Sequence, residues 1–335
     1  MHTIDLSKYS LRTDLIVESN DQTNYKTTTR EIDQIKIDTT ISNDSNERYT
    51  TVSFQDISDK DNHKKVEAIL IEELKPYINN LKLKETDPVL IIGLGNSAST
   101  PDSLGPEAIK QILVTRYLFA LGEVEEGYQN VAALAPEVTA TTGIETSELI
   151  TSLVKDINAK LLIVIDALAA SSLTRVNKTI QITNTGIHPG SGVGNNRKEI
   201  STKTLKIPVI AIGVPTVVDA TTIVSDTFKY LEKQFSYKLN NFNKASLKLI
   251  PAEKQDYSQE NKPLSKELKK EILGEIGTLT DKEFKQLIYE VLSPINYNLM
   301  VTPTEIDFLI SKLSILISTA LNKTLHQHFN PTNIK

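Results

Sequence analysis

Two aspartates have positions that suit catalysis. Asp102 comes shortly after the apolar run 89–92, and Asp166 directly follows the apolar run 161–165. Short apolar runs are typical of strands buried in a parallel sheet, and the carboxyl ends of such strands meet at one edge. Two carboxylates there can share a proton, so that one activates water while the other polarises a carbonyl group. An alternative interpretation makes one acid a helix cap and the other a loop ligand.

His188 offers a second kind of chemistry. With Asp102 and Asp166 it could complete a metal site of two carboxylates and one imidazole. A lone loop histidine is more often hydrogen-bonded or exposed, so the acid pair ranks above the metal site. The chain has no cysteine, which excludes a thiolate nucleophile and a Cys-ligated metal. A Gly-x-Ser-x-Gly nucleophile motif is also missing, and we expect neither a metal nor another cofactor.

Glycine-rich stretches leave a non-catalytic alternative open. The stretch GLGN at 93–96 resembles part of a nucleotide-binding fingerprint, although the third glycine and the later acid are not convincingly placed. A tight turn explains the glycines equally well. The loop 186–194 contains four glycines and could hold an anion through its backbone amides, or simply cover a site. A nucleotide-binding protein is therefore the alternative from a different class.

Composition restricts the possible partners and compartments. The chain has 335 residues, 39% of them hydrophobic, which is enough for a large folded core. A net charge of -5 argues against direct nucleic-acid binding. No apolar run approaches the roughly 20 residues that cross a bilayer, and the amino terminus has no apolar signal core. We expect a cytoplasmic protein that does not insert into a membrane.

The elements that must position the acids alternate between strand and helix. Expected strands lie at 31–38, 48–54, 89–92, 131–135, 161–165, 176–182 and 207–214, and an amphipathic helix at 62–80. This rhythm predicts an α/β fold with a mostly parallel sheet, helices on both faces and a C-terminal helical extension. We expect a catalytic domain over 15–250, a loop or linker over 251–265, and a helical segment over 266–335 packed on the same domain.

Helix caps account for several other acids. Stretches of the form Thr-x-x-Glu at 142–145, 280–283 and 302–305 predict capping boxes. Glu145 and Asp219 occupy expected capping positions, which is a sufficient explanation for them. Glu137 is a further acid near the same elements, with no role assigned from its position.

Several motifs together resemble the germination protease family of spore-forming Firmicutes. They are GLGN, TPDSLGP, TGIETSE, VIDALAA, TGIHPGSGVGNNRKE, IPVIAIGVPTVVDA, INYNLMVTPTEID and LNKTLH, with YSLRTDL near the amino terminus. The resemblance implies an atypical aspartic-type endopeptidase whose catalytic acids correspond to Asp102 and Asp166. The family fold is similar to that of hydrogenase maturation endopeptidases, whose corresponding acids bind a metal, so a metal-dependent endopeptidase remains the alternative.

The resemblance also implies a zymogen that cuts itself. Residues 1–14 would be the propeptide, and the bond to be cut would join Asp14 to Leu15. An acid before an apolar residue, with another acid shortly after, is the pattern of the cleavage sites in the family's substrates, the small acid-soluble spore proteins. A homotetramer located in the spore core is implied in the same way.

Some positions depart from the family pattern. Ser103 stands where the family usually has alanine, and Glu137 and Thr139 stand where glycine and methionine are common. The Ser103 change is mild. The changes at Glu137 and Thr139 put the conformation of the loop 135–142 in doubt, and they leave the two acids in place. The segment 20–60 does not align with the family motifs.

Overall fold

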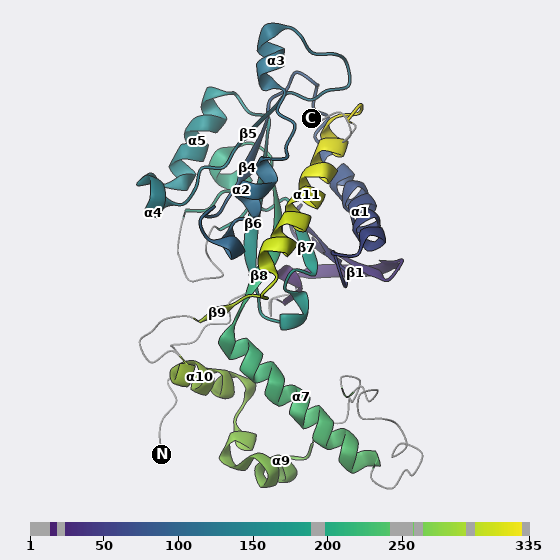
Figure 1. Ribbon diagram of the computed structural model, residues 1–335, viewed down its shortest axis with the longest axis vertical. Helices are drawn as coiled ribbons and strands as arrows, with labels where there is room; N and C mark the ends of the chain where they lie inside the picture. The colour runs from purple at the N-terminus through teal and green to yellow at the C-terminus, as the bar shows by residue number, and fades with distance from the viewer. Residues whose placement is uncertain are drawn as a thin grey trace. The chain divides into compact units, whose positions relative to one another are not determined.

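The chain forms two compact units (Figure 1). The computed structural model describes residues 14–18, 24–188, 198–241, 257, 264–292 and 299–329. The large unit comprises Arg12–Ala170, Thr174–Val217 and Thr302–Lys335, and the small unit comprises Met1–Leu11, Ser171–Leu173 and Val218–Val301. The helix at 306–325 belongs to the large unit, and the helix at 220–241 belongs to the small one.

One sheet organises the fold, with the strand order β1-β2-β3-β7-β8-β6-β4-β5 and β9 paired to β8. The strands are β1 (Tyr25–Ile32), β2 (Ile35–Ser42), β3 (Arg48–Ser53), β4 (Val89–Gly93), β5 (Val131–Leu134), β6 (Leu161–Ala170), β7 (Thr179–Thr183), β8 (Val209–Asp219) and β9 (Met300–Val301). β4 is parallel to both β5 and β6. β1, β2, β3, β7 and β8 pair antiparallel in succession, so the sheet is mixed and the expectation of a mostly parallel sheet is wrong.

The antiparallel half begins with a hairpin that the sequence pattern did not predict. The expected strand 31–38 is the junction of β1 and β2, where Ile32 pairs with Ile35 across a two-residue turn. Asp33 and Gln34 both have positive φ, 50° and 67°. Two-residue hairpin turns require this conformation and usually reveal themselves by an Asn-Gly or Asp-Gly pair. Because neither pair occurs here, the pattern resembles that of one continuous strand.

Alternating residues of the parallel strands face two hydrophobic cores. Ile91 and Ile163 pack on one side with α1 (Lys60–Asn79), α2 (Leu104–Ile109) and α11 (Ile306–Leu325), which lie side by side in Figure 1. Leu162 and Val164 pack on the other side with Ile150 of α5 (Thr146–Asp156). Helices therefore cover both faces of the parallel half, and the apolar runs at 89–92 and 161–165 follow from burial on both faces.

Helix α11 is the only described helix that is long and apolar enough to cross a membrane. Ile310, Leu313, Leu316, Ile317 and Leu321 are at most 2% exposed and belong to the core shared with α1 and α2. Packing inside the large unit therefore accounts for the apolar character of this helix.

Of the three expected capping boxes, one has the expected geometry. Thr280 and Glu283 exchange hydrogen bonds at the start of α10 (Asp281–Leu292), with the Glu283 backbone donating to Oγ1 of Thr280 at 3.3 Å and the Thr280 backbone donating to Glu283 at 2.7 Å. The box at 142–145 is wrong, because Thr142 ends α4 (Thr139–Thr142) and a left-handed Gly143 follows. The box at 302–305 is also wrong, since Thr302 donates to the Thr216 carbonyl and α11 has no side-chain cap.

The small unit is built mainly from helices. It contains α7 (Ala220–Asn241), α9 (Lys266–Leu273) and α10. Lys229 of α7 lies 2.8 Å from Asp281, and this ammonium group is the main cause that lowers the pKa of that carboxyl. Lys269 of α9 lies 2.7 Å from Glu232. The expected linker 251–265 lies largely outside the described residues.

Candidate active site

Asp166 lies in β6 at the level where the neighbouring parallel strand β4 ends, four residues before β6 itself ends at Ala170. In the register of β4 and β6, Gly93 is opposite Ile165, and the Leu94 amide donates to the Ile165 carbonyl at 2.8 Å. Asp166 is the next residue of β6, and it is 6% exposed. Its Oδ1 accepts a hydrogen bond from the Ala167 amide at 2.9 Å, which fixes the carboxylate close to the strand.

Asp102 comes to the same edge by a loop that folds back onto β4. It ends the short 3-10 helix η2 (Thr100–Asp102), which contacts β6. The Asn96 amide donates to the Asp102 carbonyl at 3.0 Å, and the Asp102 amide donates to the Ser99 carbonyl at 2.8 Å. The sheet and this loop thus bring the two predicted acids, Asp102 and Asp166, to one edge of the large unit.

Two glycines allow this loop to pack closely. Gly95 has a φ of +123°, and a Cβ atom there would lie 1.9 Å from the Asp102 carbonyl oxygen. A Cβ atom on Gly93 would lie 2.2 Å from the Gly105 carbonyl oxygen. Only glycine permits such contacts between backbones. Close packing of the Asp102 loop therefore accounts for the stretch GLGN, and the resemblance to a nucleotide fingerprint is explained without a nucleotide.

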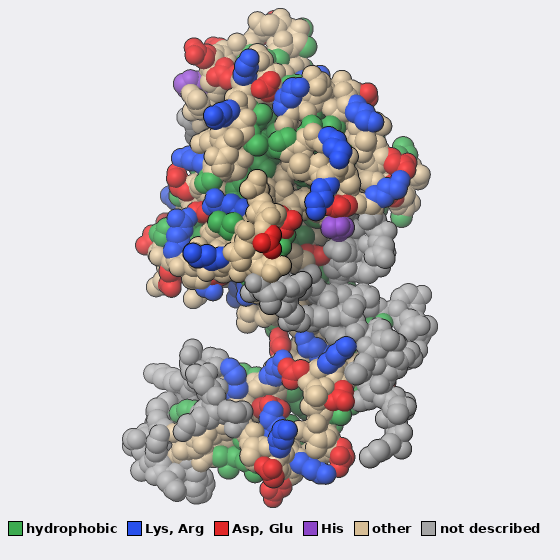
Figure 2. Space-filling model, turned by 180° about the vertical axis from the view of Figure 1, so that it is seen from behind, with side chains coloured by type: hydrophobic (Ala, Val, Ile, Leu, Met, Phe, Trp, Pro, Cys, Tyr) green, Lys and Arg blue, Asp and Glu red, His purple; other side chains and the backbone are tan. Residues whose placement is uncertain are grey.

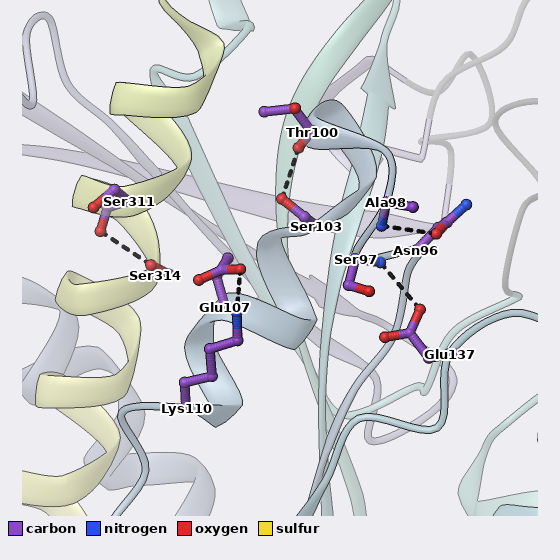
Figure 3. Close-up of polar contacts among 10 residues, drawn as sticks. All are labelled: Asn96, Ser97, Ala98, Thr100, Ser103, Glu107, Lys110, Glu137, Ser311 and Ser314. Atoms are coloured by element: carbon purple, nitrogen blue, oxygen red, sulfur yellow. Dashed lines mark hydrogen bonds and ion pairs between the residues drawn. The ribbon is translucent and has the colours of Figure 1, made fainter.

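The residues that depart from the family pattern have defined contacts around this loop (Figure 3). Ser103 donates from Oγ to the Thr100 carbonyl at 2.9 Å and so closes the η2 turn. Glu137 has a left-handed φ of 60°, a conformation that glycine adopts most easily, and its Oε2 accepts from the Ser97 amide at 3.1 Å. Thr139 donates from Oγ1 to Glu145 at 3.4 Å. Glu137 thus ties the loop 135–142 to the loop that carries Asp102.

The segment with the expected cleavage site lies along the end of β6. The Asp14 amide donates to the Ala169 carbonyl at 3.1 Å, and the Ala169 amide donates to Oδ2 of Asp14 at 3.0 Å. Ala169 is three residues beyond Asp166 on the same strand. Leu15 is 1% exposed. The Asp14–Leu15 peptide is therefore held close to the strand that carries one of the predicted acids.

Gln181 holds this segment from the other half of the sheet. Its Nε2 donates to the Asp14 carbonyl at 3.0 Å, and its Oε1 accepts from the Ile16 amide at 2.8 Å. Gln181 is the middle residue of β7 and is 6% exposed. Our sequence reasoning missed this residue. The available signal was a polar side chain between two isoleucines in a buried strand, where a buried amide needs hydrogen-bond partners.

An ion pair holds the second acid of the same segment. Residues Ile16–Glu18 form the 3-10 helix η1, and Nε of Arg175 lies 3.2 Å from Oε1 of Glu18. The side chains are 27% and 5% exposed, respectively. Arg175 lies in the connection from β6 to β7. Nothing in the sequence pattern singled out Arg175, because the fold alone brings it to Glu18.

A cavity of about 200 Å³ opens beside Asp14. Leu168, Gln181, His188 and Gly213 are among the residues that line it. Asp14, the residue that precedes the Asp14–Leu15 bond, is itself part of the lining. The cavity therefore belongs to the same site as the bound segment.

The alternative metal site is not assembled by the described residues. His188 is 64% exposed in its side chain, and its Nε2 lies 3.9 Å from a carboxylate oxygen of Glu199. Within the described ranges, no group of three His, Asp or Glu side chains is arranged to hold a metal ion. Asp219 caps α7 by accepting from the Thr222 amide at 3.1 Å. Most of the glycine loop 186–194 lies outside the described residues.

Acidic and basic side chains are mixed on the surface, in keeping with their similar numbers in the sequence. Figure 2 shows basic and acidic side chains interspersed on the face that it draws, among the residues coloured by type. A nucleic-acid backbone is bound by clustered lysines and arginines. The coloured residues of this face do not form such a cluster.

Comparison with known proteins agrees with the motifs. The model of the family described as germination protease matches residues 5–335. A protein named germination protease from Geobacillus sp. (strain WCH70) is 42% identical over 364 aligned positions, which cover 99% of this chain and 98% of that protein. Germination proteases from Bacillus cereus (strain AH187) and Bacillus anthracis (strain A0248) are each 43% identical, covering 98% of this chain and 97% of theirs. With its motifs matched along nearly the whole chain, this protein belongs to the germination protease family of endopeptidases.

Proposed function

We propose that the chain is the zymogen of an aspartic-type endopeptidase that degrades small acid-soluble spore proteins during germination. Asp102 and Asp166 act on one water molecule. One carboxylate takes a proton from the water, and the other, protonated, donates a hydrogen bond to the carbonyl oxygen of the bond to be cut. The position of both acids at one sheet edge supports this assignment, because like charges held close together favour a shared proton.

The single observation that carries the proposal is the way in which residues 14–18 are bound. Both acids of this segment have partners: Asp14 accepts from the Ala169 amide, and Glu18 pairs with Arg175. Leu15 between them is buried. An acid, a buried apolar residue and a second acid are the elements expected of a substrate site, so the segment occupies the cleft as a substrate would. The first cut then removes residues 1–14.

The partners and the location of the protein follow from the same proposal. The substrates are small acid-soluble spore proteins with an acid–apolar–x–x–acid sequence, and the site of action is the spore core. We propose a homotetramer and no direct contact with nucleic acid, in keeping with the net charge of -5.

Amino-terminal sequencing tests the proposal. After incubation of the purified full chain at mildly acidic pH, we expect a new amino terminus at Leu15. The variants Asp102→Asn and Asp166→Asn should remain folded and keep their original amino terminus. Asp156→Asn changes an exposed acid at the end of α5 and should be processed normally. Normal processing of the Asp166→Asn variant would refute the proposal.

A further inference from the structure

Gln181 makes two hydrogen bonds that flank one peptide bond. The acceptor of the first is the carbonyl oxygen of Asp14, which belongs to the Asp14–Leu15 peptide. The donor of the second is the amide of Ile16, one residue beyond that peptide. The amide of Gln181 therefore spans the bond that the proposed function assigns to cleavage.

The second bond fixes the orientation of the first. A glutamine side chain can present either its oxygen or its NH₂ group to a given neighbour, and the hydrogen-bond network decides between them. The Ile16 amide can only donate, so it selects the oxygen of Gln181. The NH₂ group must then face the Asp14 carbonyl, which can only accept. The donor is thus aimed at the carbonyl before any reaction begins.

The backbone of Gln181 is held firmly. It is paired with Thr51 of β3 on one side and Gly213 of β8 on the other. A strand in the interior of a sheet has both of its edges hydrogen-bonded, and the side chain itself is almost completely buried. Such a donor loses little entropy when a peptide binds, and burial strengthens its hydrogen bond.

We infer that Gln181 is a catalytic residue that donates a hydrogen bond to the carbonyl oxygen of the bond being cut and stabilises the charge that develops there. In the reaction, the water oxygen bonds to the Asp14 carbonyl carbon while one water proton passes to a carboxylate. The bond to the Leu15 nitrogen then breaks and that nitrogen takes a proton, which leaves a carboxylate and an amine. This inference rests on the proposed function and extends to substrate proteins that bind in the same cleft.

The test uses self-processing of the full chain. Gln181→Glu retains the size of the side chain and an oxygen for the Ile16 amide, but its carboxylate cannot donate to the Asp14 carbonyl. Loss of one such donor lowers the rate of a reaction by about 100-fold to 1000-fold, so we expect processing at pH 7 to slow by at least about 100-fold. Lowering the pH should restore part of the rate, because a protonated carboxyl group can donate. Intact mass as a function of time gives these rate constants.

Two further variants make the result decisive. Thr179→Val changes a buried residue of the same strand at nearly constant shape and should process at the wild-type rate. If Gln181→Glu fails to fold, then Gln181→Met, which is similar in size and has no donor, should show the same loss. Hydrogen exchange of the Ile16 amide should stay slow when Gln181→Glu is added to Asp166→Asn, a variant that does not cut itself. Slow exchange would show that residues 14–18 are still bound and that only the hydrogen-bond donor has been lost.

Different experimental results would contradict the inference and the proposed function. If the wild-type chain cuts after Asp14 and the folded Gln181 variants cut within about threefold of its rate, Gln181 is structural and the inference is wrong. If the wild-type chain does not cut at Asp14–Leu15 and cuts no spore protein, the proposed function is wrong and the inference fails with it.

Discussion

The parallel and antiparallel halves of the sheet meet at β8 and contribute differently to the bound segment 14–18. The parallel half contributes the backbone groups of Ala169, which form hydrogen bonds with Asp14. It also contributes the two acids, which lie toward the same edge of the sheet. From the antiparallel half comes Gln181, a side chain in the middle of a buried strand. In parallel α/β sheets, reactive groups usually lie beyond the strand ends. In this protein, Gln181 in the middle of β7 also contacts the Asp14–Leu15 peptide.

The largest expected effect is a loss of catalysis without a loss of peptide binding. In a chain that begins at Leu15, Asp166→Asn should lower kcat by about 1000-fold on a synthetic peptide with the sequence of residues 8–22, because general acid–base catalysis contributes about 100-fold to 10,000-fold. KM should stay within about threefold, since the peptide is held by other groups. Steady-state kinetics measure both, with Asp156→Asn as the control. A large rise in KM with kcat unchanged would assign Asp166 to recognition.

A buried histidine makes the edge of the parallel half sensitive to acid. His326 is 1% exposed and its Nδ1 accepts from the Gln129 amide at 3.2 Å, and burial lowers its pKa to about 4. The unfolded chain binds a proton near pH 6.5, so stability is complete above that pH and is lost as the pH falls toward 4. The free energy of unfolding should drop by about 3 kcal/mol from this residue between pH 7 and pH 4.

Urea unfolding at a series of pH values tests the role of His326. His326→Asn places an uncharged acceptor near the position of Nδ1, and its unfolding free energy should depend less on pH by about the same 3 kcal/mol. An identical pH dependence in the wild type and the variant would contradict the prediction.

Close packing of the Asp102 loop gives the third expected effect. Gly95→Ala puts a Cβ atom against the Asp102 carbonyl, and moving that loop by about 1 Å should lower the rate of self-processing by about 100-fold. Gly122 also has a positive φ, 71°, with nothing within 4 Å of an added Cβ atom, so Gly122→Ala should cost about 1 kcal/mol of stability and no activity. Equal rates in the two variants would show that the loop tolerates the shift.

The smallest expected effect concerns recognition of the second acid. Arg175→Glu should raise KM about 10-fold for a peptide with glutamate four residues beyond the cut, and leave kcat nearly unchanged. A peptide with lysine at that position should bind the variant better than it binds the wild type. The same KM for both peptides and both proteins would show that Arg175 does not select the substrate.

The parallel half was largely predictable from the sequence. Burial on both faces leaves an unbroken apolar run, and β4 and β6 lie where such runs are found. The edge strand β5 is also an apolar run, although only Val131 in it is fully buried. The same runs indicated which edge carries Asp102 and Asp166. The antiparallel half was less predictable, because β1 is almost fully exposed and its turn uses Asp33 and Gln34, which carry little turn signal.

The contacts to the bound segment could not be predicted in the same way. Arg175 and Gln181 meet residues 14–18 across more than 150 positions of chain, and only the fold sets those distances. The predictions of capping boxes at 142–145 and 302–305 were wrong for a related reason. The pattern Thr-x-x-Glu fits 142–145 and 302–305, but the first threonine ends a preceding helix and the second bonds across the sheet. Tertiary contacts decided both cases.

In the proposed self-cleavage, burial of Leu15 would affect the release of the two products. Before the cut, the buried link between Asp14 and Leu15 is a neutral amide. Afterwards the same place holds a new carboxylate and a new ammonium group, and ions are far costlier than an amide to keep away from water. The proposed hydrolysis would therefore weaken the binding of its own products. Under the proposed function, the reaction itself would supply the driving force that releases its products and frees the cleft for the next polypeptide.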